Sequence, residues 1–141
     1  MEIKGIITAM VTPFYENEDL DIESAKKMTN WLIEKGVNGL FIAGTNGEFH
    51  LLTDNERVSL TKAVVEAAAG RVPVIAGAGS CGTIHTIELS KKLVDAGADA
   101  LSLVTPYYLV PSQEDLYIHF KTIAENVDIP FLLYNIPGQT G

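Results

Sequence analysis

The sequence lacks the features that mark several other classes of protein. It contains one cysteine, Cys81, in 141 residues, so no disulfide can form within the chain. Its longest apolar runs, such as residues 101–104 and 130–134, are far shorter than the roughly twenty residues of a membrane-spanning helix. The first residues do not show the basic stretch, apolar segment and cleavage site of a secretory signal. We therefore expect a cytoplasmic protein that does not cross a membrane.

Positive charge is also scarce. Lysine and arginine number 10 against 18 aspartates and glutamates, which gives a formal net charge of -8 at pH 7. Nucleic acids and anionic membranes bind clustered cations, so neither is an expected partner. No Pro/Ser-rich linker, charge block or low-complexity segment divides the chain, and its 47% hydrophobic content is enough for one sizeable core. Residues 1–141 are expected to form a single domain with no internal boundary.

Little in the sequence favours a metal or a nucleotide cofactor. His50, His85 and His119 are far apart, and none stands at metal-ligand spacing from another histidine or a carboxylate. Residues 77–82 match the G-x-G-x-x-G pattern of dinucleotide-binding turns, but the next apolar run ends without the acidic residue that holds a ribose. We expect these glycines to allow close packing, Cys81 to fill space near a turn, and the chain to bind neither a metal nor a cofactor.

Short apolar runs and amphipathic segments alternate along the whole chain. Five runs are nearly continuous in apolar residues, which is typical of parallel strands covered on both faces. These runs are residues 5–11, 39–43, 72–76, 100–105 and 130–134. Four helices are expected between them, because helix-start residues follow the first four runs: Asp21, a Thr53–Glu56 capping box, the region near Thr83, and Ser112. Glycines mark the expected ends of the first three helices: Gly36, Gly70 and Gly97.

The runs recur at steps of roughly thirty residues, the size of one strand-and-helix unit. This repeat indicates an α/β fold, either an open doubly wound sheet or a (β/α)8 TIM barrel. A complete barrel takes about 250 residues, so five strands and four helices amount to about half of one. In both folds the chemistry lies at the carboxyl ends of the strands.

Two groups of polar side chains follow the expected strands. The turn at residues 44–48 combines small residues with Thr45 and Asn46, so it could hold a small carboxylate, although an ordinary strand-to-helix turn has the same composition. Tyr108 and Tyr134 stand at the ends of neighbouring strands, where a phenol can either relay protons or simply line the rim.

Four motifs occur in order along the chain: GTNGE at residues 44–48, VTPYY at 104–108, PSQE at 111–114 and YNIP at 134–137. In order and spacing they closely resemble the dihydrodipicolinate synthase and N-acetylneuraminate lyase family, and residues 5–14 resemble that family's first strand. The resemblance covers essentially all 141 residues. It implies a (β/α)8 barrel and a pyruvate-dependent class I aldolase, whose lysine forms a Schiff base with pyruvate or a related 2-keto acid.

The resemblance also implies roles for single residues. Thr45 matches a threonine that links two tyrosines in a proton relay. Tyr134 matches the tyrosine over the substrate, and Tyr108 the tyrosine contributed across a subunit interface, which implies a homo-oligomer, either a dimer or a tetramer. Thr45 and Asn46 are expected to hold the keto-acid carboxylate, with Asn46 in place of the family's usual second threonine. Gln139 stands where dihydrodipicolinate synthases usually have an arginine that grips the aldehyde's carboxylate, which favours a neutral or hydroxylated aldehyde.

The family's Schiff-base lysine ends the sixth strand and is expected beyond Gly141, so the isolated chain is expected to be inactive. The lysines that are present are expected to be solvated surface charges: Lys4, Lys26, Lys27, Lys35, Lys62, Lys91, Lys92 and Lys121. Two hypotheses follow. The parent protein is a carbon-carbon lyase that acts on a 2-keto acid and an aldehyde, and this chain is its N-terminal half. Alternatively, the chain is a non-catalytic half-barrel that self-associates or pairs with a complementary chain.

Overall fold

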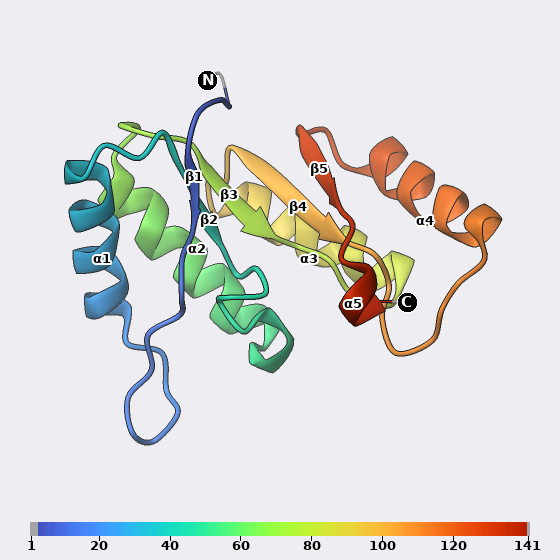
Figure 1. The fold of residues 1–141 in the computed structure, drawn as a ribbon, viewed down its shortest axis with the longest axis horizontal. Helices are drawn as coiled ribbons and strands as arrows, with labels where there is room; N and C mark the ends of the chain where they lie inside the picture. Colours follow the sequence, from blue (N-terminus) through green and yellow to red (C-terminus); the bar gives the residue numbers. More distant parts are fainter. Residues whose placement is uncertain (1–2, 141) are drawn as a thin grey trace.

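A computed structural model describes residues 3–140. Its five parallel strands form one sheet in the order β1-β2-β3-β4-β5, so each strand pairs with the next one in the sequence (Figure 1). The strands are β1 (Ile7–Ala9), β2 (Gly39–Ile42), β3 (Val74–Gly77), β4 (Ala100–Val104) and β5 (Phe131–Tyr134). The helices that follow the first four strands are α1 (Ile22–Glu34), α2 (Asp54–Ala68), α3 (Thr83–Asp95) and α4 (Gln113–Asn126). The expected five strands and four helices are confirmed.

Two short helices were not anticipated from the sequence. One is the 3-10 helix η1 (Phe49–Leu51) between β2 and α2, and the other is α5 (Pro137–Thr140) after β5. Both lie just beyond the carboxyl end of a strand. They therefore border the end of the sheet where the candidate site residues are expected.

Local chemistry explains where the long helices begin and end. The Asp21 carboxylate accepts a hydrogen bond from the amide of Ser24, and reciprocal capping boxes open α2 at Thr53 and α4 at Ser112. The three expected terminal glycines all lie just past a helix and adopt positive φ, a conformation that glycine enters without steric cost: Gly36 (85°), Gly70 (70°) and Gly97 (96°). These boundary predictions are confirmed.

The hydrophobic core lies between the sheet and the helices, which in Figure 1 stand behind the sheet and at its two sides. Alternate strand residues point into this layer and meet apolar side chains from α2, α3 and α4. The large side chains that are almost fully buried are Leu40, Ile42, Val64, Val74, Leu89, Leu93, Leu101, Leu103 and Ile123. Within residues 3–140, no helix combines the length and the apolar composition needed to cross a membrane.

The opposite side of the sheet, called here the inner face, is only partly covered. Every residue of β3 and β4 is buried, as expected for strands covered on both faces. β1 and β5 depart from that expectation, because in the described chain each has a neighbouring strand on one side only. Leu132 and Leu133 are 46% and 58% exposed. A groove of about 220 Å³ runs along the inner face and is lined in part by Ile7, Phe41 and Leu132.

Candidate active site

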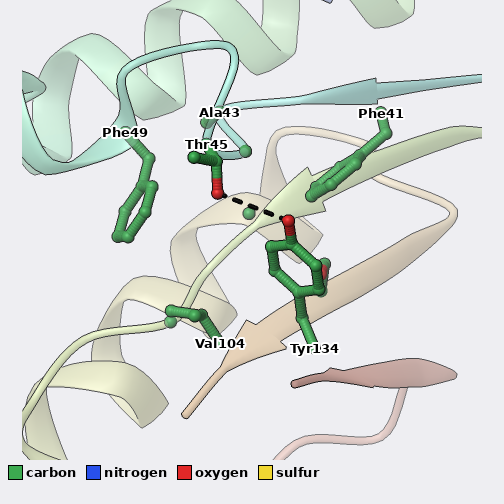
Figure 2. A pocket seen from close by; sticks show the side chains of 10 residues that line it. Phe41, Ala43, Thr45, Phe49, Val104 and Tyr134 are labelled. Atoms are coloured by element: carbon green, nitrogen blue, oxygen red, sulfur yellow. Dashed lines mark hydrogen bonds between the residues drawn. The ribbon is translucent and has the colours of Figure 1, made fainter. Parts of the chain in front are cut away.

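The carboxyl ends of β2 and β5 bring two predicted site residues together. The Thr45 hydroxyl donates a hydrogen bond to the phenol oxygen of Tyr134, at 3.5 Å, which is long for such a bond. Figure 2 shows the two hydroxyls facing each other, with the Phe41 ring beside them. Thr105 holds the backbone of Tyr134 from β4, because both its amide and its hydroxyl donate to the Tyr134 carbonyl at 3.3 Å. The fold therefore brings the hydroxyls of Thr45 and Tyr134 together.

The turn that carries Thr45 and Asn46 is anchored from the first strand. The buried Thr12 hydroxyl donates to the Gly47 carbonyl at 2.7 Å. Later amides of the turn are bonded inside it, including that of Gly47 to the Gly44 carbonyl at 3.1 Å. Among residues 3–140, no protein group accepts a hydrogen bond from the amides of Thr45 and Asn46. These two consecutive N–H groups, together with two exposed polar side chains, can bind a small carboxylate.

A cavity of about 250 Å³ opens beside Thr45. Aromatic, aliphatic and neutral polar residues line it, together with one histidine: Thr45, Phe49, His50, Val104, Tyr107, Ile136, Gln139 and Thr140. Within the described chain, neither a lysine nor an arginine lines this cavity. Gln139, expected to face the aldehyde, contributes a neutral amide to the wall that it shares with His50.

Tyr108 lies outside this cavity. It is 95% exposed and adopts a φ of 77° in the loop between β4 and α4. Its neighbour Tyr107 lines the cavity instead and packs edge-to-face on Phe49, with ring centroids 5.7 Å apart. Burial raises the pKa of the Tyr107 phenol, and nearby Cys81 raises it further. Sequence reasoning missed Tyr107 and Phe49 as site residues, although Tyr107 lies inside the VTPYY motif and Phe49 directly follows the GTNGE motif.

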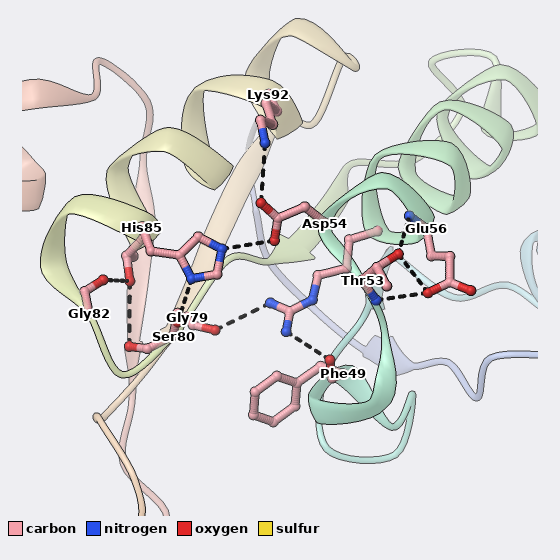
Figure 3. A network of polar contacts seen from close by, with 11 residues as sticks. Phe49, Thr53, Asp54, Glu56, Gly79, Ser80, Gly82, His85 and Lys92 are labelled. Carbon is pink, nitrogen blue, oxygen red and sulfur yellow. Dashed lines mark hydrogen bonds and ion pairs between the residues drawn. The ribbon is translucent and has the colours of Figure 1, made fainter.

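A second polar cluster, shown in Figure 3, joins α2 to α3. The His85 ring bonds to Ser80 through Nδ1 and to Asp54 through Nε2, both at 2.9 Å, and the Lys92 ammonium reaches Asp54 at 3.2 Å. Burial acts to raise the pKa of Asp54, but the hydrogen bonds from His85 and Lys92 outweigh it and lower that pKa. Asp54 and His85 are far apart along the chain, so no sequence spacing predicts this contact. Among residues 3–140, no cluster of acidic, histidine and cysteine side chains suits a metal ion.

The glycine-rich segment after β3 allows close packing, as expected. A Cβ at Gly77 would lie 1.9 Å from the carbonyl oxygen of Ala43, and a Cβ at Gly79 would lie 2.6 Å from the amide nitrogen of Val104. Cys81 departs from its expected role as a packed space-filler. It is exposed, and its thiol donates to the Tyr107 carbonyl at 3.2 Å, because the segment runs over the surface toward the β4 loop.

A sequence model of the dihydrodipicolinate synthetase family matches residues 2–141. The chain belongs to that family. The family resemblance inferred from the four motifs is confirmed, and with it the fold class, a half of a (β/α)8 barrel.

Two members of the dihydrodipicolinate synthetase family illustrate the match. The 4-hydroxy-tetrahydrodipicolinate synthase 1 of Halalkalibacterium halodurans is 52% identical over 141 residues, which cover 100% of this chain and 48% of the relative. The chloride-inhibited dihydrodipicolinate synthase of Acinetobacter baumannii, solved in complex with pyruvate, superposes with a TM-score of 0.96 at 46% identity. That alignment covers 99% of this chain and 48% of the other.

A third member is a prophage protein of Escherichia coli K12, also solved in complex with pyruvate. It superposes with a TM-score of 0.93 at 37% identity, over 97% of this chain and 46% of its own. The chain therefore spans about half the length of the family members it matches.

Proposed function

We propose that this chain is the N-terminal half of a Schiff-base-forming lyase or aldolase that uses or releases pyruvate or a related 2-keto acid. The observation that carries the proposal is the Thr45–Tyr134 hydroxyl pair beside two free turn amides and a cavity. Family membership supports it, as do the pyruvate complexes of two relatives.

The turn amides and side chains of Thr45 and Asn46 hold the keto-acid carboxylate. Because Thr12 anchors the turn, these donors need little reorganisation during the reaction, and that preorganisation is the main source of electrostatic catalysis. When a lysine amine condenses with the keto group, the carbonyl oxygen leaves as water and needs protons. When the resulting enamine adds to an aldehyde, the aldehyde oxygen gains one proton. Thr45 and Tyr134 carry these protons, with Tyr108 of a neighbouring subunit completing the relay.

The nucleophilic lysine comes from beyond Gly141, so the isolated chain does not form the Schiff base. Two of its own lysines are already paired away from the cavity, Lys26 with Glu66 and Lys92 with Asp54. Incubation with pyruvate and borohydride followed by mass measurement tests both statements. The complete protein should gain a reduced pyruvate adduct, and the 141-residue chain should gain none. An adduct on the isolated chain, or no adduct on the complete protein, would contradict the proposal.

The second substrate is a neutral, hydroxylated aldehyde. The carboxylate of aspartate semialdehyde needs a cation, and the cavity wall offers Gln139 instead. Glyceraldehyde and aspartate semialdehyde, each offered with pyruvate to the complete protein, provide the direct comparison.

A second candidate is a non-catalytic half-barrel that associates with itself or with a complementary chain. The inner-face groove and the exposed Leu132 and Leu133 favour it, because unpaired strand edges and apolar surface promote association. Sedimentation of the 141-residue chain over a wide concentration range tests this candidate. A monomer at every concentration would exclude self-association.

A further inference from the structure

Arg57 of α2 is a buried cation without a carboxylate partner in the described chain. It is 6% exposed, and burial lowers the pKa of its guanidinium. Its Nη2 donates to the Phe49 carbonyl at 2.7 Å and its Nη1 to the Gly79 carbonyl at 3.3 Å, the two bonds drawn to these residues in Figure 3. Its Nε is buried and, among residues 3–140, has no hydrogen-bond partner.

These two carbonyls belong to different segments. Phe49 begins η1, after the turn that carries Thr45, and Gly79 lies in the loop between β3 and α3. Gly79 is itself fixed, because its backbone packs against Val104 closely enough to exclude a Cβ. The guanidinium therefore ties η1 to a rigid neighbour.

The same guanidinium supports an aromatic wall. Its carbon lies 5.3 Å from the centroid of the Phe49 ring, and that ring packs edge-to-face on Tyr107 and on His50. Phe49 and Tyr107 both line the 250 Å³ cavity, whereas Arg57 lies behind them. A buried charge without an ion-pair partner costs stability relative to an apolar residue of similar size. We therefore expect Arg57 to add little to the free energy of unfolding and to act mainly by placing the groups it contacts.

We propose that Arg57 is a positioning residue that fixes the Phe49–Tyr107 wall of the cavity and so sets the affinity for the aldehyde. The inference rests on the proposed aldolase function. The keto-acid side of the site has further anchors of its own, Thr12 under the turn and Thr105 on Tyr134. Loss of Arg57 therefore affects the aldehyde and spares pyruvate.

The test uses the complete protein with pyruvate and glyceraldehyde as the two probes. In Arg57→Met, the KM for glyceraldehyde should rise roughly tenfold. A displacement of the Phe49–Tyr107 wall by a fraction of an ångström has an effect of that order. The KM for pyruvate, borohydride trapping of pyruvate and the melting temperature should stay close to wild type. Arg57→Lys, which can bond one carbonyl, should give an intermediate KM. Arg71→Met is the matched control, because Arg71 also donates to a backbone carbonyl, that of Ala68 at 3.0 Å, but lies away from the cavity.

Three outcomes overturn the inference: an unchanged glyceraldehyde KM in Arg57→Met, equal rises in both KM values, or the same effect in Arg71→Met. If Arg57→Met does not fold, Phe49→Leu decides instead. That variant should raise the glyceraldehyde KM with Arg57 intact, and an unchanged KM would overturn the inference. Failure of the aldolase proposal itself is distinguishable, because the wild-type complete protein would then trap no pyruvate.

Discussion

The ring of Tyr134 meets the ring of Phe41 edge-on, with centroids 6.3 Å apart and planes at 89°. The same Phe41 ring lies against Gly44, where an added Cβ would come within 2.7 Å of it. One aromatic side chain on the inner face therefore contacts both the turn before Thr45 and the phenol that Thr45 meets. Because packing places these groups, the hydroxyl of Thr45 or that of Tyr134 can be removed while the rings of Tyr134 and Phe41 stay in place.

Tyr134→Phe in the complete protein should lower kcat by on the order of a hundredfold to a thousandfold, since the phenol proton is lost from the relay. The KM for pyruvate should change little, because the turn amides remain. Steady-state kinetics with pyruvate and glyceraldehyde measures both. Tyr117→Phe, an exposed tyrosine on α4, is the control. An unchanged kcat in Tyr134→Phe would remove the phenol from the mechanism.

Tyr108 should act in the site of a neighbouring subunit, because in its own chain it is exposed and outside the cavity. Tyr108→Phe and Tyr134→Phe should each be nearly inactive. Mixing the two after dissociation should restore about a quarter of wild-type activity, since half the random dimers then contain one intact composite site. Recovery is measured against each variant reassociated alone. If mixing restores nothing, Tyr108 does not act across a subunit interface.

Gln139→Arg should shift kcat/KM toward aspartate semialdehyde by roughly tenfold to a hundredfold. A charged hydrogen bond to a carboxylate contributes about 1.5–3 kcal/mol, and about 1.4 kcal/mol corresponds to a factor of ten. The ratio of kcat/KM for the semialdehyde and for glyceraldehyde is the measurement, with Gln113→Arg on α4 as the control. Faster turnover of the semialdehyde by the unmodified protein would contradict the neutral-aldehyde proposal.

Stability should fall as the pH drops below about 6.5, because His119 is held in its neutral form. Burial between α3 and α4 lowers the pKa of His119 from its ordinary 6.5, and its Nδ1 bonds to the Thr83 hydroxyl at 2.9 Å. The unfolded chain then binds more protons than the folded one below pH 6.5, so the free energy of unfolding decreases until the lower folded-state pKa is passed.

Urea unfolding at several pH values between about 7.5 and about 5.5 measures this loss. His119→Gln should flatten the pH dependence, whereas His50→Gln, at an exposed position, should leave it intact. An unchanged slope in His119→Gln would assign the effect to another group. The lowered pKa values of Asp21, Asp54 and Asp115 act at lower pH, so they do not obscure this window.

The strands and helix boundaries could be predicted because their causes are local. Asp21 caps with a residue three positions away, and Gly36 ends α1 through its own φ. The exposure of β1 and β5 is not a local property. An apolar run such as residues 130–134 indicates a strand, but the open edge follows from the expectation that the chain supplies only about half of a barrel.

Part of the site could likewise be predicted. Thr45 and Tyr134 follow strands, and parallel strands end at one edge of the sheet. Their approach therefore follows from the fold class. Arg57 and Tyr107 were missed. A helical arginine usually faces solvent, and only the packing of η1 against the loop between β3 and α3 buries Arg57. His85 and Asp54 were missed for the same reason: helices adjacent in space bring together residues that no sequence spacing relates.

The strictly sequential strand order has a consequence for synthesis on the ribosome. Each strand that emerges finds its partner already made in the preceding unit, so the sheet can grow from one edge without waiting for distant segments. The growing edge, however, always displays unpaired backbone groups, and at β5 these lie beside Leu132 and Leu133. A nascent chain of this length therefore exposes apolar side chains beside an unpaired strand edge, and translation pauses here should increase aggregation.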